Sequence, residues 1–259
     1  MIQIRSEDEI DKMRTSCRIA AEAMEIARYE VKPGITTGKI AEKVQSFIEK
    51  KGAKPAFLGY NGYPGAICVS VNEEVVHGIP GNRVLEEGDL IKLDIGTYLD
   101  GFFGDMARSY PVGKISEDIK ALIETTREAF YEGVGQAVSG NHVGDIGYAV
   151  QHYAEERGYG VVRALVGHGI GRNLHEDPQV PNFGVKGSGQ RLKSGMILAI
   201  EPMINMGDWE VDVLSDDWTM VTSDGKMSAH YENTCVIREG YAEILTLLSG
   251  EEAWQKTTQ

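Results

Sequence analysis

Two aspartates near the middle of the chain are spaced so that they could act together. Asp94 lies in an apolar run, and Asp105 follows an Asp-Gly pair at 100–101, which is typical of a two-residue hairpin turn. Such a turn pairs position 94 with 107 and puts both aspartates on one face, one diagonal step apart. Either one of them stays protonated or a cation lies between them. Two unrelated aspartates in solvent are the simpler alternative.

Hydrophobic spacing predicts the elements that must position this hairpin. Its strands are expected at 90–98 and 102–110. Ser6 and Glu9 form a capping-box signal for the first helix, and Thr37 is the expected cap of the second. The predicted helices are 7–30, 37–52, 117–138 and 145–157, and further strands are predicted at 67–71, 161–166, 196–204, 217–222 and 227–238.

The bulk composition restricts the class of protein. The chain has 259 residues, of which 42% are hydrophobic and 25% are charged, and no apolar run approaches the ~20 residues that a membrane helix needs. The net charge of −13, without a basic cluster, argues against binding to nucleic acid or to an anionic membrane. We expect no signal peptide at the start of the chain. Three widely spaced cysteines predict free thiols and a cytoplasmic location.

A weak internal repeat suggests that the fold is duplicated. Residues 85–94 align with 192–201, and this alignment matches Asp94 with Glu201. The tripeptide His-Gly-Ile occurs once in each half, at His77 and His168. The prediction is a single domain over 1–259, with halves of about 7–113 and 116–248 packed about a pseudo-two-fold axis. A chance match over ten residues is the alternative.

If the halves pack in this way, four acids converge from four strands: Asp94, Asp105, Glu201 and Glu232. Burying four carboxylates without cations would be costly, whereas two divalent cations would neutralise them. Carboxylates with one imidazole, for which His168 on its glycine-flanked loop is the candidate, suit manganese, iron, cobalt or zinc. Paired metals of this kind form a hydrolytic device.

Other residues have both a functional and a plain structural interpretation. Phe57, Tyr60 and Tyr63 lie in a loop rich in glycine and proline, where they could anchor the loop or line a pocket. His77 precedes a glycine and, taken alone, is better interpreted as a surface imidazole.

Taken together, these motifs resemble the type I methionine aminopeptidases. The resemblance covers about residues 1 to 248 and rests on DIG with GFFGD, then GHGIG, AIEP and YENT, in that order. It implies an α+β, pita-bread fold with pseudo-two-fold halves around a central antiparallel sheet, as in prolidase, aminopeptidase P and creatinase. It also implies a metalloexopeptidase that hydrolytically removes the initiator methionine from nascent polypeptides whose second residue is small.

The resemblance assigns roles to individual residues. Asp94 would bind one of two divalent metal ions, Asp105 and Glu232 would bridge both, and His168 and Glu201 would complete the second site. Glu201 would also act as the catalytic base. His175 would donate to the scissile carbonyl and His77 would contact the nitrogen side of the scissile bond, and the substrate's amino terminus would bind at the Asp94 metal.

The methionine pocket, by the same resemblance, is formed by Tyr60, Tyr63, Cys68 and Trp218. Many bacterial relatives have cysteine where this chain has Phe57, so we expect a pocket of altered shape. Leu174 stands where relatives often have phenylalanine, a change expected to be minor.

Several other functions are compatible with parts of this pattern. An X-Pro aminopeptidase or prolidase shares the fold but usually carries an extra N-terminal domain, and type II enzymes carry a helical insertion for which the spacing from His168 to Glu232 leaves no room. A non-catalytic pita-bread binding protein or a structural cation-binding protein would not need the histidines at His77 and His175. The expected partners are nascent peptide N-termini, with ribosome association suggested by the family alone, and the expected state is a monomer.

The two ends of the chain carry separate expectations. Residues 249–259 are polar, and we expect a frayed tail. Because Ile2 is large and β-branched, such an enzyme would leave Met1 on its own chain.

Overall fold

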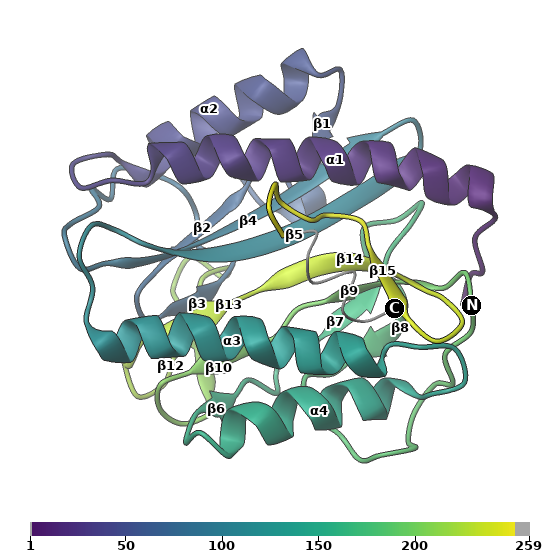
Figure 1. The fold of residues 1–259 in the computed structure, drawn as a ribbon. Coiled ribbons are helices and arrows are strands. Elements are labelled where there is room, and N and C mark those ends of the chain that lie inside the picture. Colours follow the sequence, from purple (N-terminus) through teal and green to yellow (C-terminus); the bar gives the residue numbers. More distant parts are fainter. Residues whose placement is uncertain (1, 252–259) are drawn as a thin grey trace.

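The computed structural model of the protein describes residues 2–251 and is built on a nine-stranded antiparallel sheet (Figure 1). Its strand order is β1-β4-β5-β14-β9-β7-β8, with β2 paired to β4 and β15 paired to β14. The strands are β1 (Lys54–Pro55), β2 (Cys68–Val71), β4 (Leu90–Leu99), β5 (Phe102–Pro111), β7 (Gly167–Gly169), β8 (Glu176–Val180), β9 (Ile197–Ile200), β14 (Glu232–Ile237) and β15 (Ala242–Ile244). The pairing of β5 with β14 joins the two halves of the sequence at the centre of the sheet.

Two smaller three-stranded sheets complete the β structure. One has the order β13-β10-β6 and the other β11-β12-β3. Their strands are β3 (Glu74–Val76), β6 (Gly160–Val161), β10 (Met203–Asn205), β11 (Val211–Val213), β12 (Met220–Thr222) and β13 (Ser228–His230).

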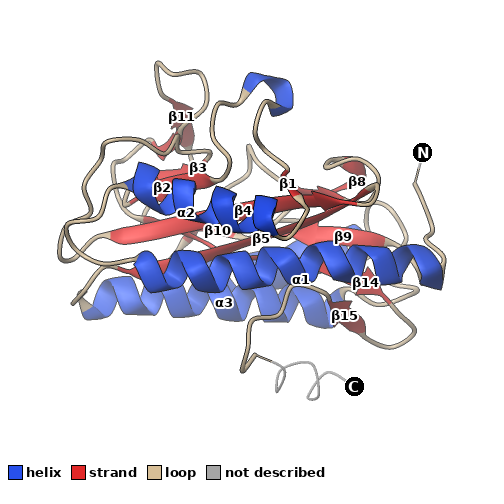
Figure 2. Cartoon of the chain, turned by 90° about the horizontal axis from the view of Figure 1, so that it is seen from above, coloured by secondary structure: helices blue, strands red, loops and turns tan. Residues whose placement is uncertain are grey.

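Helices cover one face of the large sheet. Figure 2 shows α1 and α3 along one side of the strands, whereas β11 lies on the opposite side. A short 3-10 helix, η1 (Tyr60–Gly62), precedes β2. The helices are α1 (Glu7–Glu30), α2 (Thr37–Lys50), α3 (Glu117–Gln136) and α4 (Val143–Glu155). Helix α1 packs on β4 and β5, and α2 packs against α1 and β1 in the same buried aliphatic cluster. Helix α3 packs on β9 and β10, and α4 packs against α3, β6 and β8.

The central hairpin has the predicted register. Asp94 pairs with Ala107, and the turn residues Asp100 and Gly101 both have positive φ, as a two-residue hairpin turn of this kind requires. The capping box of α1 is also confirmed, because the Ser6 hydroxyl accepts from the Glu9 amide and the Glu9 carboxylate accepts from the Ser6 amide.

Some predicted boundaries are wrong. Thr36, not Thr37, caps α2, because its hydroxyl accepts from the Lys39 amide while Thr37 contacts Gly81 instead. Helix α4 starts two residues early, at Val143, because Asp145 caps it by accepting from the amide of His142. Of the predicted strand 161–166, only Val161 lies in a strand, β6 (Gly160–Val161), and α3 ends at Gln136.

The predicted tail is also corrected in part. Leu248 is buried and Glu251 forms hydrogen bonds with the core, so the chain is held as far as residue 251. Residues 252–259, and the expectation about Met1, lie outside the described residues. None of the helices in residues 2–251 has the length and apolar content that a membrane span requires.

The close approach of α1 to β5 yields a prediction about stability. A Cβ at Gly104 would lie 2.8 Å from the Cys17 Cα and backbone N, so Gly104→Ala should lower the free energy of unfolding by about 1–3 kcal/mol. Gly135→Ala is the matched control, because nothing lies within 4 Å of its Cβ position and the helix α3 should gain about 0.5–1 kcal/mol. Urea unfolding of both metal-free variants measures this, and an unchanged midpoint for Gly104→Ala would contradict the packing described.

Candidate functional site

The sheet order brings the predicted acids and the imidazole together. Asp94 lies on β4, Asp105 on β5, Glu232 at the start of β14, Glu201 directly after β9, and His168 on β7. These are five successive neighbours in the sheet. Each strand therefore contributes one polar side chain, although the five residues are far apart along the chain.

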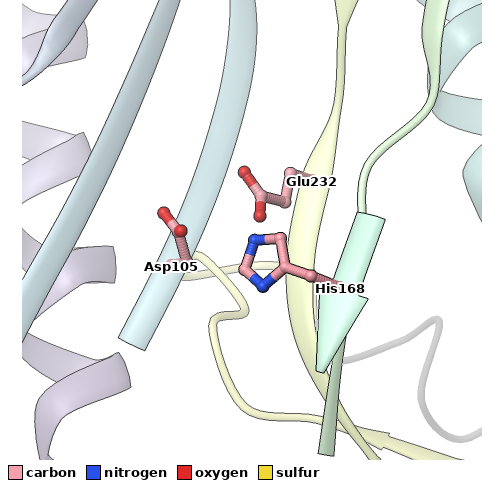
Figure 3. Close-up of side chains that lie close together, drawn as sticks. All are labelled: Asp105, His168 and Glu232. Carbon is pink, nitrogen blue, oxygen red and sulfur yellow. The ribbon is translucent and has the colours of Figure 1, made fainter. Parts of the chain in front are cut away.

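Asp105, His168 and Glu232 form the tightest part of this cluster. Each offers one ligand atom, and these atoms lie within 4.8 Å of one another. Figure 3 shows the two carboxylates and the ring facing a common space from three separate strands. The backbone beside them is fixed as well, because the Thr234 hydroxyl accepts from the Asp105 amide and donates to the Asp105 carbonyl, at 3.1 and 2.8 Å.

The His168 ring has the tautomer that a metal ligand needs. Its Nδ1 lies 2.9 Å from the Gly169 carbonyl, which can only accept, so Nδ1 carries the proton. The Nε2 lone pair therefore faces the site, with Nε2 3.6 Å from Glu201 Oε1. Burial lowers the pKa of His168 to about 3, which keeps the ring neutral.

Burial raises the pKa of all four carboxylates, and the charges of neighbouring acids raise it further in three of them. Burial, followed by the charges of Asp105 and Glu201, holds the pKa of Asp94 well above its usual range. The pKa values of Glu201 and Glu232 are raised well above normal for the same two reasons, and burial raises that of Asp105 to about 7. Among the described residues, Oδ1 of Asp94 and Oδ1 of Asp105 are buried without a hydrogen-bond partner.

This donor set fits divalent cations. Buried oxygens without partners and a neutral imidazole with a free lone pair are what a carboxylate-rich metal site provides. A pair of dications would balance the charge of the four acids and remove the cause of their raised pKa values.

His175 is held by a contact that the sequence did not predict. Its Nδ1 lies 2.6 Å from the Tyr60 hydroxyl, and its ring centroid is 4.3 Å from that of His168. Burial lowers the pKa of His175, so the ring is neutral. If the Tyr60 hydroxyl donates to Nδ1, the proton of His175 is on Nε2, where it can be donated to a ligand.

His77 is partly buried, contrary to the surface interpretation. Its backbone adopts φ +61°, and burial lowers the pKa of its ring to about 4. The glycine that follows it is required, because a Cβ at Gly78 would lie 2.3 Å from the Val69 carbonyl. The turn therefore holds the imidazole of His77 at the edge of the site.

The candidate metal ligands and the histidines line one cavity of about 210 Å³. Every candidate site residue from the sequence lines it, together with Leu174 and Asn61: Phe57, Tyr60, Tyr63, Cys68, His77, Asp94, Asp105, His168, His175, Glu201, Trp218 and Glu232. Tyr63 and Trp218 meet edge to face at 5.2 Å. The Phe57 ring fills the space above Gly96, where a Cβ would lie 2.5 Å from its Cε1 atom.

His230 is a residue of this region that the sequence analysis missed. It is 1% exposed, its Nε2 lies 3.7 Å from Glu201 Oε2, and neither ring nitrogen has a hydrogen-bond partner within residues 2–251. Its position two residues before Glu232 in an extended run was the available signal, since residues i and i+2 of a strand share a face.

Comparison with known proteins identifies the family. The sequence profile of Metallopeptidase family M24 matches residues 11–239. The chain belongs to metallopeptidase family M24. It is 50% identical over 248 residues to "Methionine aminopeptidase" of Clostridium acetobutylicum, covering 95% of this chain and 99% of that one. It is also 50% identical over 246 residues to "Methionine aminopeptidase 1" of Bacillus subtilis, with coverages of 95% and 99%.

Solved structures agree with the fold. Methionine aminopeptidase from Rickettsia prowazekii superposes with a TM-score of 0.94 at 41% identity, covering 95% of this chain and all of that one. Prolidase from Pyrococcus furiosus has a TM-score of 0.77 at 24% identity, covering 95% of this chain and 66% of that one, and shares the fold alone. The α+β, pita-bread fold expected from the sequence is confirmed, and so is the assignment to a metallopeptidase family.

The carboxylate cluster predicts how the metal-free M24 chain responds to pH. Acids with raised pKa values keep their protons in the folded state, whereas the same acids in the unfolded chain lose theirs above about pH 4. The folded state therefore binds more protons, and the free energy of unfolding falls as pH rises. Each such proton contributes a slope of up to about 1.4 kcal/mol per pH unit. The buried histidines act in the opposite direction only below about pH 6.5, so the acids decide the sign above neutrality.

Comparison with an Asp94→Asn variant isolates this effect. Burial lowers the pKa of Lys92 to about 7, so Lys92 makes stability rise with pH, but it does so in both proteins and cancels in the comparison. Chelator-treated wild type should lose more stability than the variant between about pH 6.5 and pH 8.5 in denaturant titrations. The free energy of unfolding of wild type minus that of the variant should therefore fall as pH rises. A value that stays constant or rises with pH would show that the pKa of Asp94 is not raised in the folded protein.

Proposed function

We propose that this protein is a methionine aminopeptidase, a metal-dependent hydrolase that removes the initiator methionine from nascent polypeptides with a small second residue. The observation that carries the proposal is 50% identity over nearly the whole chain to proteins of that name, combined with the convergence of the predicted acids and histidines on one cavity.

Asp94, Asp105, His168, Glu201 and Glu232 would hold two divalent cations, of cobalt, manganese, iron or zinc. The raised pKa values of the acids and the free Nε2 of His168 support this assignment. When bound, such a pair lowers the pKa of water and polarises a carbonyl group.

The remaining chemistry is assigned to side chains of this chain. Glu201 would accept the proton of the attacking water, a role that suits a carboxylate that lines the cavity beside the other candidate ligands. His175 would donate from Nε2 to the carbonyl oxygen as negative charge develops there, with Tyr60 fixing its tautomer. His77 would contact the nitrogen side of the scissile bond.

The shape of the site supports removal of one residue from a chain end. The cavity of about 210 Å³ has room for a side chain of methionine's size beside the acids, and Tyr63, Cys68 and Trp218 offer it aromatic and sulfur contacts. A more open hollow of about 950 Å³ shares His168 and His175 with it, which leaves space for the rest of a peptide. Phe57 would reshape the methionine pocket relative to a cysteine.

The same proposal covers the organisation of the chain. Residues 7–113 and 116–248 would be the two halves of one catalytic domain within 1–259, acting as a monomer in the cytoplasm on nascent peptide N-termini, with ribosome association. Cys17, Cys68 and Cys235 are all buried and free, which supports a reducing compartment. An X-Pro aminopeptidase is the second candidate, but no feature of the site favours it.

Peptide selectivity tests the proposal directly. The metal-loaded protein should hydrolyse Met-Ala-Ser and release methionine, with kcat/KM at least about 100-fold above that for Ala-Pro, because an apolar pocket of this kind discriminates by side-chain fit. Steady-state assays of both peptides at one metal concentration measure this. Faster turnover of the proline peptide would assign the protein to the X-Pro enzymes instead.

Substitution of Glu201 tests the assigned base. Glu201→Gln keeps the shape of the side chain but loses the basic oxygen, so kcat should fall by about 10²–10⁴. Glu210→Gln, an exposed site, is the matched control and should leave kcat unchanged. Circular dichroism checks that both variants fold, and wild-type turnover by Glu201→Gln would remove this residue from the mechanism.

A further inference from the structure

A buried arginine lies behind the candidate metal centre. Arg108 is 3% exposed and sits three positions after Asp105 on β5, so the two side chains project from opposite faces of the strand. Arg108 is therefore on the helix-covered face, whereas Asp105 faces the cavity. A buried guanidinium needs an acceptor for each of its donors, and its partners show what it holds in place.

Arg108 holds the beginning of β14. Its Nη1 donates to the backbone carbonyls of Glu232 at 2.6 Å and Ala107 at 2.9 Å, and its Nη2 donates to Asn233 Oδ1 at 2.9 Å. The main chain of Glu232 is thus tied to β5 from behind while its carboxylate points into the cavity. The Arg108 guanidinium is therefore one of the contacts that hold the main chain of Glu232, the candidate metal ligand, in place.

Glu251, near the end of the described chain, supplies the countercharge. Its Oε2 lies 2.9 Å from Arg108 Nη2 and its Oε1 3.4 Å from Nε, a two-point contact. The carboxylate also accepts from the Leu248 amide at 2.9 Å and from the Tyr231 hydroxyl at 3.2 Å. The Tyr231 ring lies against the guanidinium, 4.0 Å from Cζ to the centroid. The tail is therefore built into the support of β14.

We propose that Glu251 is a positioning residue for the metal centre, which acts through Arg108 to fix the main chain of Glu232. The inference rests on the proposed function, because it takes Glu232 as a metal ligand. Without the carboxylate, the buried guanidinium lacks a countercharge and will turn toward solvent, which frees the Glu232 carbonyl and loosens the strand that carries the ligand. Contacts that orient metal ligands from behind strongly affect metal affinity.

Metal titration of the full chain tests this proposal. We expect Glu251→Ala to weaken the Kd for Mn²⁺, measured by calorimetry on metal-free protein, by about tenfold. The visible absorption of the Co²⁺-loaded variant should differ from that of wild type in band position or intensity, because the ligand set is displaced. Glu251→Gln, which keeps an accepting oxygen but no charge, should give an intermediate Kd.

Glu7→Ala is the matched control. Like Glu251→Ala, it deletes a carboxylate that pairs with an arginine next to β14. Glu7 pairs with Arg238, which lies just beyond the end of that strand. Arg238 keeps Glu243 as a second partner. The Glu7–Arg238 pair is remote from Glu232 along the strand. The Mn²⁺ affinity and the Co²⁺ spectrum of the Glu7→Ala protein should therefore equal those of wild type.

The outcomes separate a positioning role from a purely structural one. A lower free energy of unfolding in the metal-free Glu251→Ala protein, with unchanged Mn²⁺ affinity and Co²⁺ spectrum, would overturn the proposal, as would equal weakening in Glu7→Ala. If Glu251→Ala does not fold, the Glu251→Gln values decide by the same criterion. Failure of wild type itself to bind Mn²⁺ would instead contradict the proposed function.

Discussion

The repulsion among four carboxylates in one cavity, two of them buried and two half-buried, is the constraint on which the rest of this structure depends. Asp94, Asp105, Glu201 and Glu232 share one cavity. Burial raises the pKa of each, and the charges of neighbouring acids raise it further at Asp94, Glu201 and Glu232. Such an arrangement is unfavourable unless protons or cations neutralise it. A fold that keeps these acids together at the cost of stability therefore indicates a function that requires them, and a hydrolytic metal pair is the function that the donor set and the M24 relatives support.

The sheet provides the rigidity that this arrangement needs. Because β4, β5, β14, β9 and β7 are adjacent, hydrogen-bonded ladders set the spacing between the acids, and no flexible loop has to bring them together. The helices bury the back of these strands, which fixes the strands further and leaves the opposite face for the cavity (Figure 2). His77 and His175 come from loops and Tyr60 from the short helix η1, where the chain has more freedom to match a substrate.

The sequence predicted the parts of the site that are governed by local rules or by the repeat. The register of Asp94 against Ala107 followed from one turn, and the match of Asp94 with Glu201 followed from the repeat. The remaining candidate site residues on distant segments were predicted through the family resemblance, and other contacts between distant segments could not be predicted. His230 and the bond of Tyr60 to His175 depend on tertiary packing, and Glu251 belongs to a polar tail whose composition resembles that of a disordered end. Helix caps were misplaced by one or two residues where neighbouring polar side chains competed.

Anomalous diffraction from crystals soaked in Mn²⁺ or Co²⁺ tests the assignment of a two-metal site, because it locates the cations without reference to activity. We expect two anomalous peaks in the cavity, within ~2.0–2.3 Å of ligand atoms from Asp94, Asp105, His168, Glu201 and Glu232. A well-ordered crystal with no peak in this cavity, or with metal bound only to other residues, would contradict this assignment.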